Sequence, residues 1–218
     1  MNYSEMERLD LFRGLNSTEI SHICNCFGTS IVNYKKNETV VGEGEKLKKF
    51  GIVLAGTASS FKIDISGKVF TVAVIKKGGY IGAFLASDSE KHSPVTVMAT
   101  DRLTVLFIPF KRLVQQCGKN CSAGSAHTKV LTNFITGVCE KAMLLFERID
   151  CLIKPTIREK AMAYLVQQSN GQATFDIPFN REQLAEYLNT ERSALSRELS
   201  NMKKDSLIDY KKNFFEIL

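Results

Sequence analysis

The sequence predicts an α+β protein with a β-rich N-terminal domain, a long helix and a small, mostly helical C-terminal domain. Three observations carry this prediction. Short β-rich runs separated by turn residues fill residues 31–109, an apolar heptad pattern runs through residues 122–150, and a capped helical pair precedes a hairpin pattern in residues 180–218. The 218 residues are enough for two small domains.

The composition is that of a globular cytoplasmic protein. Hydrophobic residues make up 44% of the chain, and no apolar run approaches the roughly 20 residues that cross a bilayer. The N-terminus lacks the apolar stretch of a signal peptide. The six cysteines are expected to stay free thiols in a reducing compartment. We therefore expect a cytoplasmic location and no membrane partner.

The N-terminal part is expected to begin with one or two short helices in residues 2–27, with Ser17 as an N-cap. Between residues 31 and 109 the short apolar runs are IVNY, TVV, FGIVLAG, SSFKID, VFTVAVI, VTVMA and LTVLFIP. Gly-rich or Asn-rich turns separate them. This spacing is typical of an antiparallel barrel or sandwich.

The long helix, residues 122–150, carries apolar residues at alternating steps of four and three. Such a heptad pattern favours a two-stranded coiled coil and so a homodimer, and the alternative is a helix packed on its own domain. Gly137 should cost ~1 kcal/mol relative to alanine in this helix, so packing must support that turn. The predicted dimer residues are Leu131, Ile135, Val138, Ala142, Leu145 and Ile149.

Pro155 should end this helix, because proline disfavours helical geometry in the residue before it. A new helix is expected at residues 156–168, so residues 154–155 form a predicted hinge. These boundaries divide the chain into a β-rich N-terminal domain (1–121), a predicted dimerisation helix that leads into the hinge (122–153) and a C-terminal domain (154–218).

Residues 180–202 have the pattern of a helix-turn-helix. Asn180 can cap a first helix, and the small Ala185 lies where a second helix must cross closely. Asn189 suits the left-handed turn conformation, and Thr190 is the expected cap of the second helix. The alternative is an ordinary helical hairpin with solvated arginines.

The second helix should present Arg192, Ser193, Ser196 and Arg197 on one outward face. Recognition helices read bases from their N-terminal turns, and an arginine can donate two hydrogen bonds to one guanine. The following SLIDYKKNFFEIL predicts a two-stranded wing whose lysines reach phosphates. The pattern therefore indicates binding of double-stranded DNA.

Overall charge does not decide the partner. The net charge is +6 with a pI near 9.0. Residues 154–218 contain ten Lys and Arg against nine Asp and Glu, a net of +1. The DNA-binding hypothesis therefore depends on where these charges lie.

The sequence resembles the cAMP receptor protein/FNR (Crp/Fnr) family of bacterial transcription regulators over nearly its whole length. LFRGL (11–15), FGIVLAGTASSFKID, KKGGYIG (76–82) and above all SALSREL (193–199) carry the resemblance. It implies a cyclic-nucleotide-binding-like β-roll, a dimerisation helix and a winged helix-turn-helix. It further implies a homodimer on a palindromic operator, with RNA polymerase as a candidate partner.

The resemblance also implies roles for single residues. Arg192, Ser193 and Arg197 match the base-reading positions, and Ser193 stands where the family often has glutamate, which predicts a related half-site that keeps its arginine-to-guanine contacts. The expected phosphate contacts are Asn180, Thr190, Ser196 and Lys212.

The phosphate-binding cassette of the cAMP-binding members is degenerate in this chain. Ala83 follows Gly82 in place of a glutamate, and Ser93 and Pro94 stand where an arginine and a hydroxyl residue are expected. A buried phosphate without that cation would be costly. We therefore expect these four residues to line an effector pocket that does not take cAMP, and the effector is unidentified.

No cofactor, metal site or enzymatic activity is expected. Cys24 and Cys26 are too close for the usual iron–sulfur spacing, and Cys117 and Cys121 are interpreted as incidental thiols. His22, His92 and His127 are scattered, and no catalytic motif is present. The alternative to a DNA-binding regulator is a small-molecule-binding module that does not read DNA.

Overall fold

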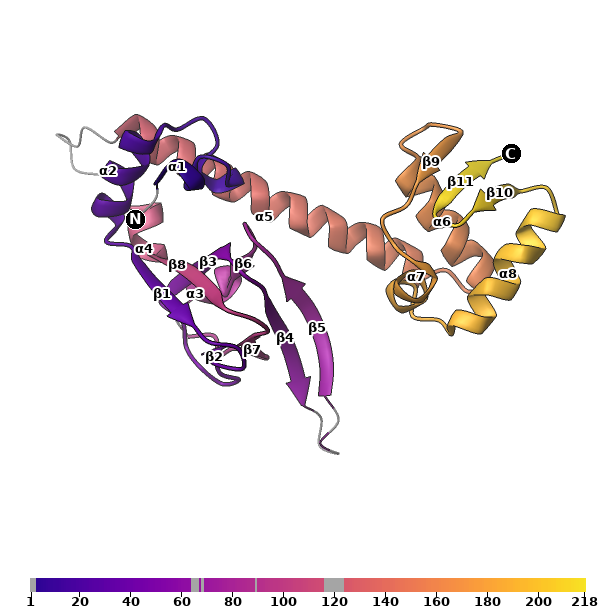
Figure 1. Ribbon diagram of the computed structural model, residues 1–218, viewed down its shortest axis with the longest axis horizontal. Helices are drawn as coiled ribbons and strands as arrows, with labels where there is room; N and C mark the ends of the chain where they lie inside the picture. Colours follow the sequence, from indigo (N-terminus) through magenta and orange to yellow (C-terminus); the bar gives the residue numbers. More distant parts are fainter. Residues whose placement is uncertain (1–2, 64–66, 68, 89, 116–123) are drawn as a thin grey trace. The chain divides into compact units, whose positions relative to one another are not determined.

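The computed structural model describes residues 3–63, 67, 69–88, 90–115 and 124–218 (Figure 1). Contacts divide the chain into an N-terminal unit, Met1–Gly137, and a C-terminal unit, Val138–Leu218. The division falls inside the long helix α5 (Gly124–Leu152), whereas the sequence places domain boundaries after residues 121 and 153. Cys117, Cys121 and the first of those boundaries lie outside the described residues.

The N-terminal unit is a β-roll flanked by helices. Its strands form two four-stranded antiparallel sheets, in the orders β1-β8-β3-β6 and β2-β7-β4-β5, which confirms the antiparallel β-rich domain. β6, α3 and α4 are additions that the sequence did not predict. The elements in chain order are α1 (Tyr3–Met6), the 3-10 helix η1 (Asp10–Phe12), α2 (Ser17–Phe27), β1 (Ser30–Tyr34), β2 (Thr39–Val41), β3 (Lys49–Ala55), β4 (Ala58–Ile63), β5 (Val69–Ile75), β6 (Tyr80–Ile81), α3 (Ala83–Ala86), β7 (Thr96–Ala99), β8 (Leu103–Pro109), α4 (Phe110–Val114) and the first part of α5.

The β-roll core lies on the central strands β3 and β8. Ile52 pairs with Leu106 across them, and both side chains are fully buried. The β3–β4 turn depends on Gly56, which has φ +80°, and a Cβ there would lie 2.2 Å from the Arg102 carbonyl oxygen. Only glycine is compatible with this turn. β4 and β5 then continue side by side as a long hairpin (Figure 1).

The helices beside the β-roll are held by capping and by side-chain bonds to the backbone. Asn16, not the predicted Ser17, is the N-cap of α2, and its side chain accepts a hydrogen bond from the Glu19 amide at 2.9 Å. The Asn16 backbone amide in turn donates to the Glu19 carboxylate at 2.9 Å, which completes a capping box. On α5, the Asn133 amide donates to the carbonyls of Leu11 and Arg13.

The predicted packing around Gly137 is confirmed within the N-terminal unit. A Cβ at Gly137 would lie 3.1 Å from the Tyr80 hydroxyl oxygen, so a larger residue would force the two apart. One turn earlier, Phe134 packs its ring against Phe50 and Tyr80, with ring centroids 4.9 and 5.6 Å away. These contacts offset the low helix propensity of glycine.

The C-terminal unit packs helices against a small sheet of order β10-β11-β9. Thr156 and Glu159 form a capping box that begins α6, close to the predicted start of that helix. The core includes the fully buried side chains of Leu195, Leu199 and Phe215. The elements are the remainder of α5, α6 (Ile157–Ser169), β9 (Thr174–Asp176), α7 (Arg181–Tyr187), α8 (Arg192–Lys204), β10 (Ile208–Lys211) and β11 (Phe214–Ile217).

Among the described residues, no helix is long and apolar enough to span a membrane.

Candidate nucleic-acid interface

α7, α8 and the turn between them form the predicted helix-turn-helix. The Asn180 side-chain oxygen accepts hydrogen bonds from the backbone amides of Glu182 and Gln183 at 3.0 and 2.9 Å, and the Asn180 backbone amide donates to the Gln183 side-chain oxygen at 2.9 Å. Ala185 is buried in the C-terminal core. Asn189 has φ +50°, the left-handed conformation expected of the turn residue.

Thr190 does not cap α8, so that prediction is wrong. α8 begins at Arg192 with Glu191 at the N-cap position and no side-chain cap. The Thr190 amide instead donates to the Ala185 carbonyl at 2.9 Å, which closes the turn. Its hydroxyl oxygen is buried and has no hydrogen-bond partner among the described residues. In this conformation the Thr190 hydroxyl is not accessible to a phosphate, contrary to the expected phosphate contact.

α8 turns a polar face outward and an apolar face inward. Leu195 and Leu199 are fully buried, and Arg192 and Arg197 are exposed, as is Ser193. Neither arginine forms an ion pair or hydrogen bond with any residue in the described part of the chain. Both guanidinium groups are therefore available to an external hydrogen-bond acceptor.

Ion pairs within the C-terminal unit occupy Glu198 of α8, Asp205 at the C-terminal end of α8 and Asp209 of β10. Arg158 of α6 donates to Glu198 at 2.6 Å and to Asp205 at 2.7 Å, and these bonds raise its pKa. Lys203 pairs with Asp209 and lowers the pKa of that carboxyl group. The net charge of this domain is close to zero, but several of its acidic residues are paired with cations of the same domain while Arg192 and Arg197 remain exposed. The net charge alone does not reveal this distribution.

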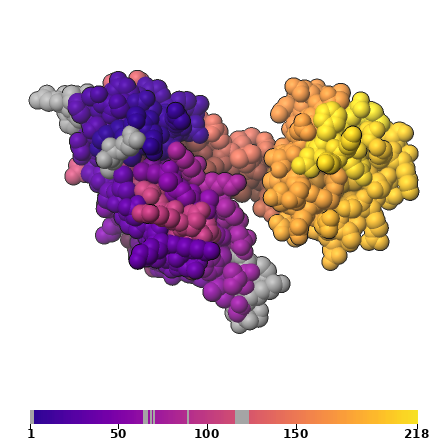
Figure 2. Space-filling model, in the orientation of Figure 1, coloured from indigo at the N-terminus to yellow at the C-terminus, as the bar shows by residue number. Residues whose placement is uncertain are grey.

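The predicted wing is the β10–β11 hairpin, residues 208–217. Lys212 lies in its turn with φ +57° and is exposed. The end of the chain that forms this hairpin is the yellow surface in Figure 2. Arg181 of α7 holds the hairpin in place, because its guanidinium carbon lies 5.0 and 5.4 Å from the ring centres of Tyr210 and Phe215. Burial lowers the pKa of Arg181. The sequence carried no signal for this positioning role.

The last two turns of α5 are bonded to α6 and α7 within the C-terminal unit. Arg148 donates to the Tyr187 carbonyl at 3.2 Å, and its guanidinium carbon lies 5.2 Å from the Tyr187 ring centre. Gln167 of α6 donates to the Glu147 carbonyl at 3.1 Å and accepts from the Cys151 thiol at 3.2 Å. Burial raises the pKa of that thiol. These contacts fix the first helix of the helix-turn-helix to the end of α5.

Replacing Arg148 with alanine is expected to weaken DNA binding while the fold is retained. The change removes a charge-assisted hydrogen bond to the end of α7 and a cation–π contact. Arg148→Lys keeps the charge but loses the planar fork, so it should recover only part of the affinity. DNA titrations and thermal unfolding of both variants check this. Equal DNA affinity in wild type and Arg148→Ala would contradict a positioning role.

The predicted dimer face of α5 is only partly open. Ile135, Leu145 and Ile149 are exposed at 53, 57 and 53%, while Leu131, Val138 and Ala142 are half-buried. Phe146 and Ile153, which do not belong to the predicted set of dimer residues, are exposed at 66 and 69%. Large apolar side chains open to this extent suit a surface that another chain covers.

A second heptad register has the same spacing as the predicted one and collects more of these exposed side chains. Its members on α5 are Ile135, Cys139, Ala142, Phe146 and Ile149, and Ile153 continues the spacing one residue beyond the end of the helix. Three of them, Ile135, Ala142 and Ile149, belong to both registers. The heptad count alone could not separate the two, because adjacent registers share residues on one face of a helix.

The degenerate cassette keeps its backbone turn but offers no cation at the expected positions. Gly82 has φ +67°, and Ala83 begins the short helix α3 in a largely buried position. Ser93 is 2% exposed, and its hydroxyl donates to the Val95 carbonyl at 2.7 Å. Pro94 is exposed. The Ser93 hydroxyl is therefore committed to the protein backbone.

The lysines near the cassette have acidic partners of their own. Lys46 pairs with Glu90 at 3.0 Å, and Lys91 pairs with Asp88 at 3.8 Å.

Within the described residues, no group of three or more His, Cys, Asp or Glu side chains could hold a metal ion.

A β-roll unit together with a winged helix-turn-helix whose second helix exposes arginines defines a DNA-binding transcription regulator. Residues 31–120 match the cyclic nucleotide-binding domain family, and residues 159–218 match the Crp-like helix-turn-helix domain. The two matches cover more than half of the chain in the expected order. The chain belongs to the Crp/Fnr family of transcription regulators, and these matches point to a transcription regulator.

A curated relative is similar to this chain in sequence, and solved structures are similar to it in fold. The chain is 26% identical over 183 residues to the transcriptional activator protein FnrL of Cereibacter sphaeroides, covering 81% of this chain and 71% of FnrL. The fold is similar to that of CprK complexed with OCPA, with a TM-score of 0.61 at 14% identity over 91% of this chain and 88% of CprK. It is also similar to the c-di-GMP-responsive regulator CLP of Xanthomonas campestris, with a TM-score of 0.56 at 13% identity over 93% of this chain and 99% of CLP.

Proposed function

We propose that this regulator binds a palindromic operator as a homodimer, with one α8 helix in each of two successive major grooves. The observation that carries the proposal is the pair of exposed, unpaired arginines on the outward face of α8. Two-fold symmetry would place the recognition helices about 34 Å apart, one turn of B-DNA. Such a protein acts where the bacterial chromosome lies, in the cytoplasm.

In this proposal Arg192, Ser193 and Arg197 read bases, while Asn180, Ser196 and Lys212 position the protein on phosphates. Ser193 is exposed and short, so it adds at most a hydroxyl contact to the arginine-to-guanine pairs. The side-chain oxygen of Asn180 accepts the capping hydrogen bonds of α7. The side-chain NH₂ group of Asn180 therefore remains as the donor to a phosphate.

Salt dependence tests whether the proposed phosphate contacts exist. Each phosphate neutralised by a lysine or arginine releases counterions, so the logarithm of the DNA association constant should fall linearly with the logarithm of salt concentration. Fluorescence anisotropy with a labelled operator would measure this slope. A slope near zero would rule out a DNA-binding function of this kind.

The N-terminal unit is proposed to control DNA binding through an effector other than cAMP. Calorimetric titration with cAMP is expected to give no binding heat, because Ala83, Ser93 and Pro94 supply neither the carboxylate for the ribose nor the cation for the phosphate. Micromolar cAMP binding would overturn this prediction. A cAMP-binding member of the family, titrated in parallel, is the positive control.

A further inference from the structure

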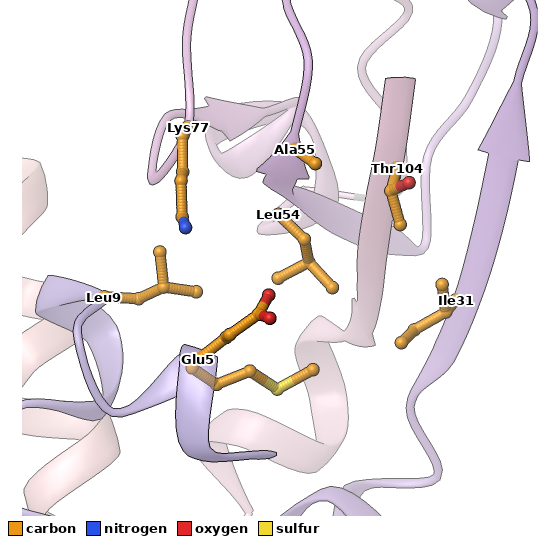
Figure 3. Close-up of a pocket in the computed structure, with 8 residues that line it drawn as sticks. Glu5, Leu9, Ile31, Leu54, Ala55, Lys77 and Thr104 are labelled. Atoms are coloured by element: carbon orange, nitrogen blue, oxygen red, sulfur yellow. The ribbon is translucent and has the colours of Figure 1, made fainter. Parts of the chain in front are cut away.

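A cavity of about 230 Å³ lies in the N-terminal unit, away from the cassette, where the N-terminal segment meets β1, β3, β8 and the turn before β6 (Figure 3). Drug-sized ligand sites have volumes of about 300–1,000 Å³, so this cavity suits only a small molecule. It is lined by Glu5, Met6, Leu9, Ile31, Leu54, Ala55, Lys77 and Thr104.

The lining combines an apolar floor with two opposite charges. Met6 and Leu9 are 3 and 4% exposed, so they form a fixed base. The Glu5 carboxylate and the Lys77 ammonium group extend from opposite sides into the space bordered by Leu9 and Leu54 (Figure 3). The cavity therefore presents one hydrogen-bond acceptor group, one donor group and a hydrophobic surface to the same occupant.

The backbone that carries Lys77 is fixed before any ligand arrives. The Gly79 amide donates to the Lys76 carbonyl at 2.8 Å and closes the turn. The Gly78 amide donates to the Val53 carbonyl at 2.8 Å, and the Val53 amide donates to the Gly79 carbonyl at 3.0 Å. Two bonds to β3 thus hold this turn at the rim of the cavity, which reduces the ordering cost of binding.

We propose that this cavity binds a small zwitterion with an apolar side chain, of the class of a free aliphatic α-amino acid. The ligand ammonium group pairs with Glu5, its carboxylate pairs with Lys77, and its alkyl chain packs on Leu9 and Leu54. A fatty acid would use only Lys77, and an alkylamine would use only Glu5. A zwitterion with an alkyl side chain pairs with both Glu5 and Lys77 and also contacts the apolar residues between them.

Calorimetry with three probes of related carbon skeleton tests the ligand class. L-leucine carries both charged groups, 4-methylpentanoate lacks the ammonium group, and 3-methylbutylamine lacks the carboxylate. Leucine should bind, and each analogue should bind at least about tenfold more weakly, the loss expected for one charge-assisted hydrogen bond. Absence of leucine binding up to about 10 mM would overturn the proposal. Stronger binding of either analogue would overturn the zwitterion assignment.

Substitutions test the place of binding. Glu5→Gln and Lys77→Gln should each weaken leucine binding at least about tenfold. Glu7→Gln and Lys76→Gln are matched controls, because both residues are exposed neighbours that do not line the cavity. Thermal unfolding of all four variants should match wild type. Full leucine affinity in either cavity variant would overturn the site assignment.

The amino acid is then a candidate effector, a step that rests on the proposed DNA-binding function. A leucine-dependent change in operator affinity that disappears in Lys77→Gln supports this role. Unchanged operator affinity in leucine-saturated protein would overturn the effector role and leave the calorimetric binding site intact. The two failures are therefore distinguishable.

Discussion

Replacing Arg192 or Arg197 with alanine is expected to remove most of the sequence-specific DNA binding. Each guanidinium group is exposed and has no partner in the described part of the chain, so nothing in the protein compensates for its loss. A bidentate arginine-to-guanine pair contributes about 1–3 kcal/mol of discrimination. Since a homodimer loses one such pair in each half-site, the cost should be about 2–6 kcal/mol per operator.

Selection of bound duplexes from a random DNA library measures this effect on an operator of unknown sequence. Wild type should enrich a palindrome, and each arginine variant should relax the guanine preference at one position per half-site. Lys212→Ala is the control: it should weaken binding nearly uniformly and reduce the salt slope without changing the preferred sequence. Repeating a failed selection with cell extract would separate a missing effector from the absence of DNA reading.

If the protein is the proposed homodimer, replacing Ile149 with aspartate is expected to convert it to a monomer. Ile149 is exposed at 53% on α5 and belongs to both heptad registers, so it faces the partner helix in either alignment. In a parallel two-fold seam the new carboxylates would lie close together in an apolar interface, where unpaired charges cost several kcal/mol. Operator affinity should fall by at least about 100-fold, since only one half-site remains engaged.

Sedimentation velocity and DNA titration measure the two consequences. Leu144→Asp is a matched control, because Leu144 is also exposed, at 61%, and lies five residues and about 140° around the helix from Ile149. That variant should stay dimeric. An Ile149→Asp protein that remains dimeric, or a wild-type protein that is monomeric while bound to its operator, would contradict the proposed interface.

The sequence predicted the DNA-binding part well, because its signals are local. Asn180 and Asn189 act through hydrogen bonds and backbone conformations within a few residues of themselves. The β-roll strands could be predicted for the same reason, from short apolar runs between turns. The wrong prediction for Thr190 also has a local cause. The Thr190 backbone amide closes the turn by donating to the Ala185 carbonyl, and α8 begins two residues later, at Arg192.

Other features depend on contacts between distant segments, which a sequence pattern does not contain. Arg148 and Tyr187 are far apart in the chain, as are Arg181 and Tyr210, and only the folded C-terminal unit brings them together. The heptad count could not distinguish two overlapping registers. The cavity between the N-terminal segment and the β-roll is lined by separate stretches of the chain, so no sequence motif indicates it.

The contacts of Arg148 and Cys151 also decide where the chain can be cut. A fragment starting at Lys154 would leave the Tyr187 carbonyl without its arginine and would lose the buried Cys151 from the core. A fragment starting at Val138 keeps both. Structural and DNA-binding work on the isolated C-terminal unit should therefore use the fragment that starts at Val138. Poor expression of the fragment that starts at Lys154 would result from the missing contacts of Arg148 and Cys151 and not from an unstable domain.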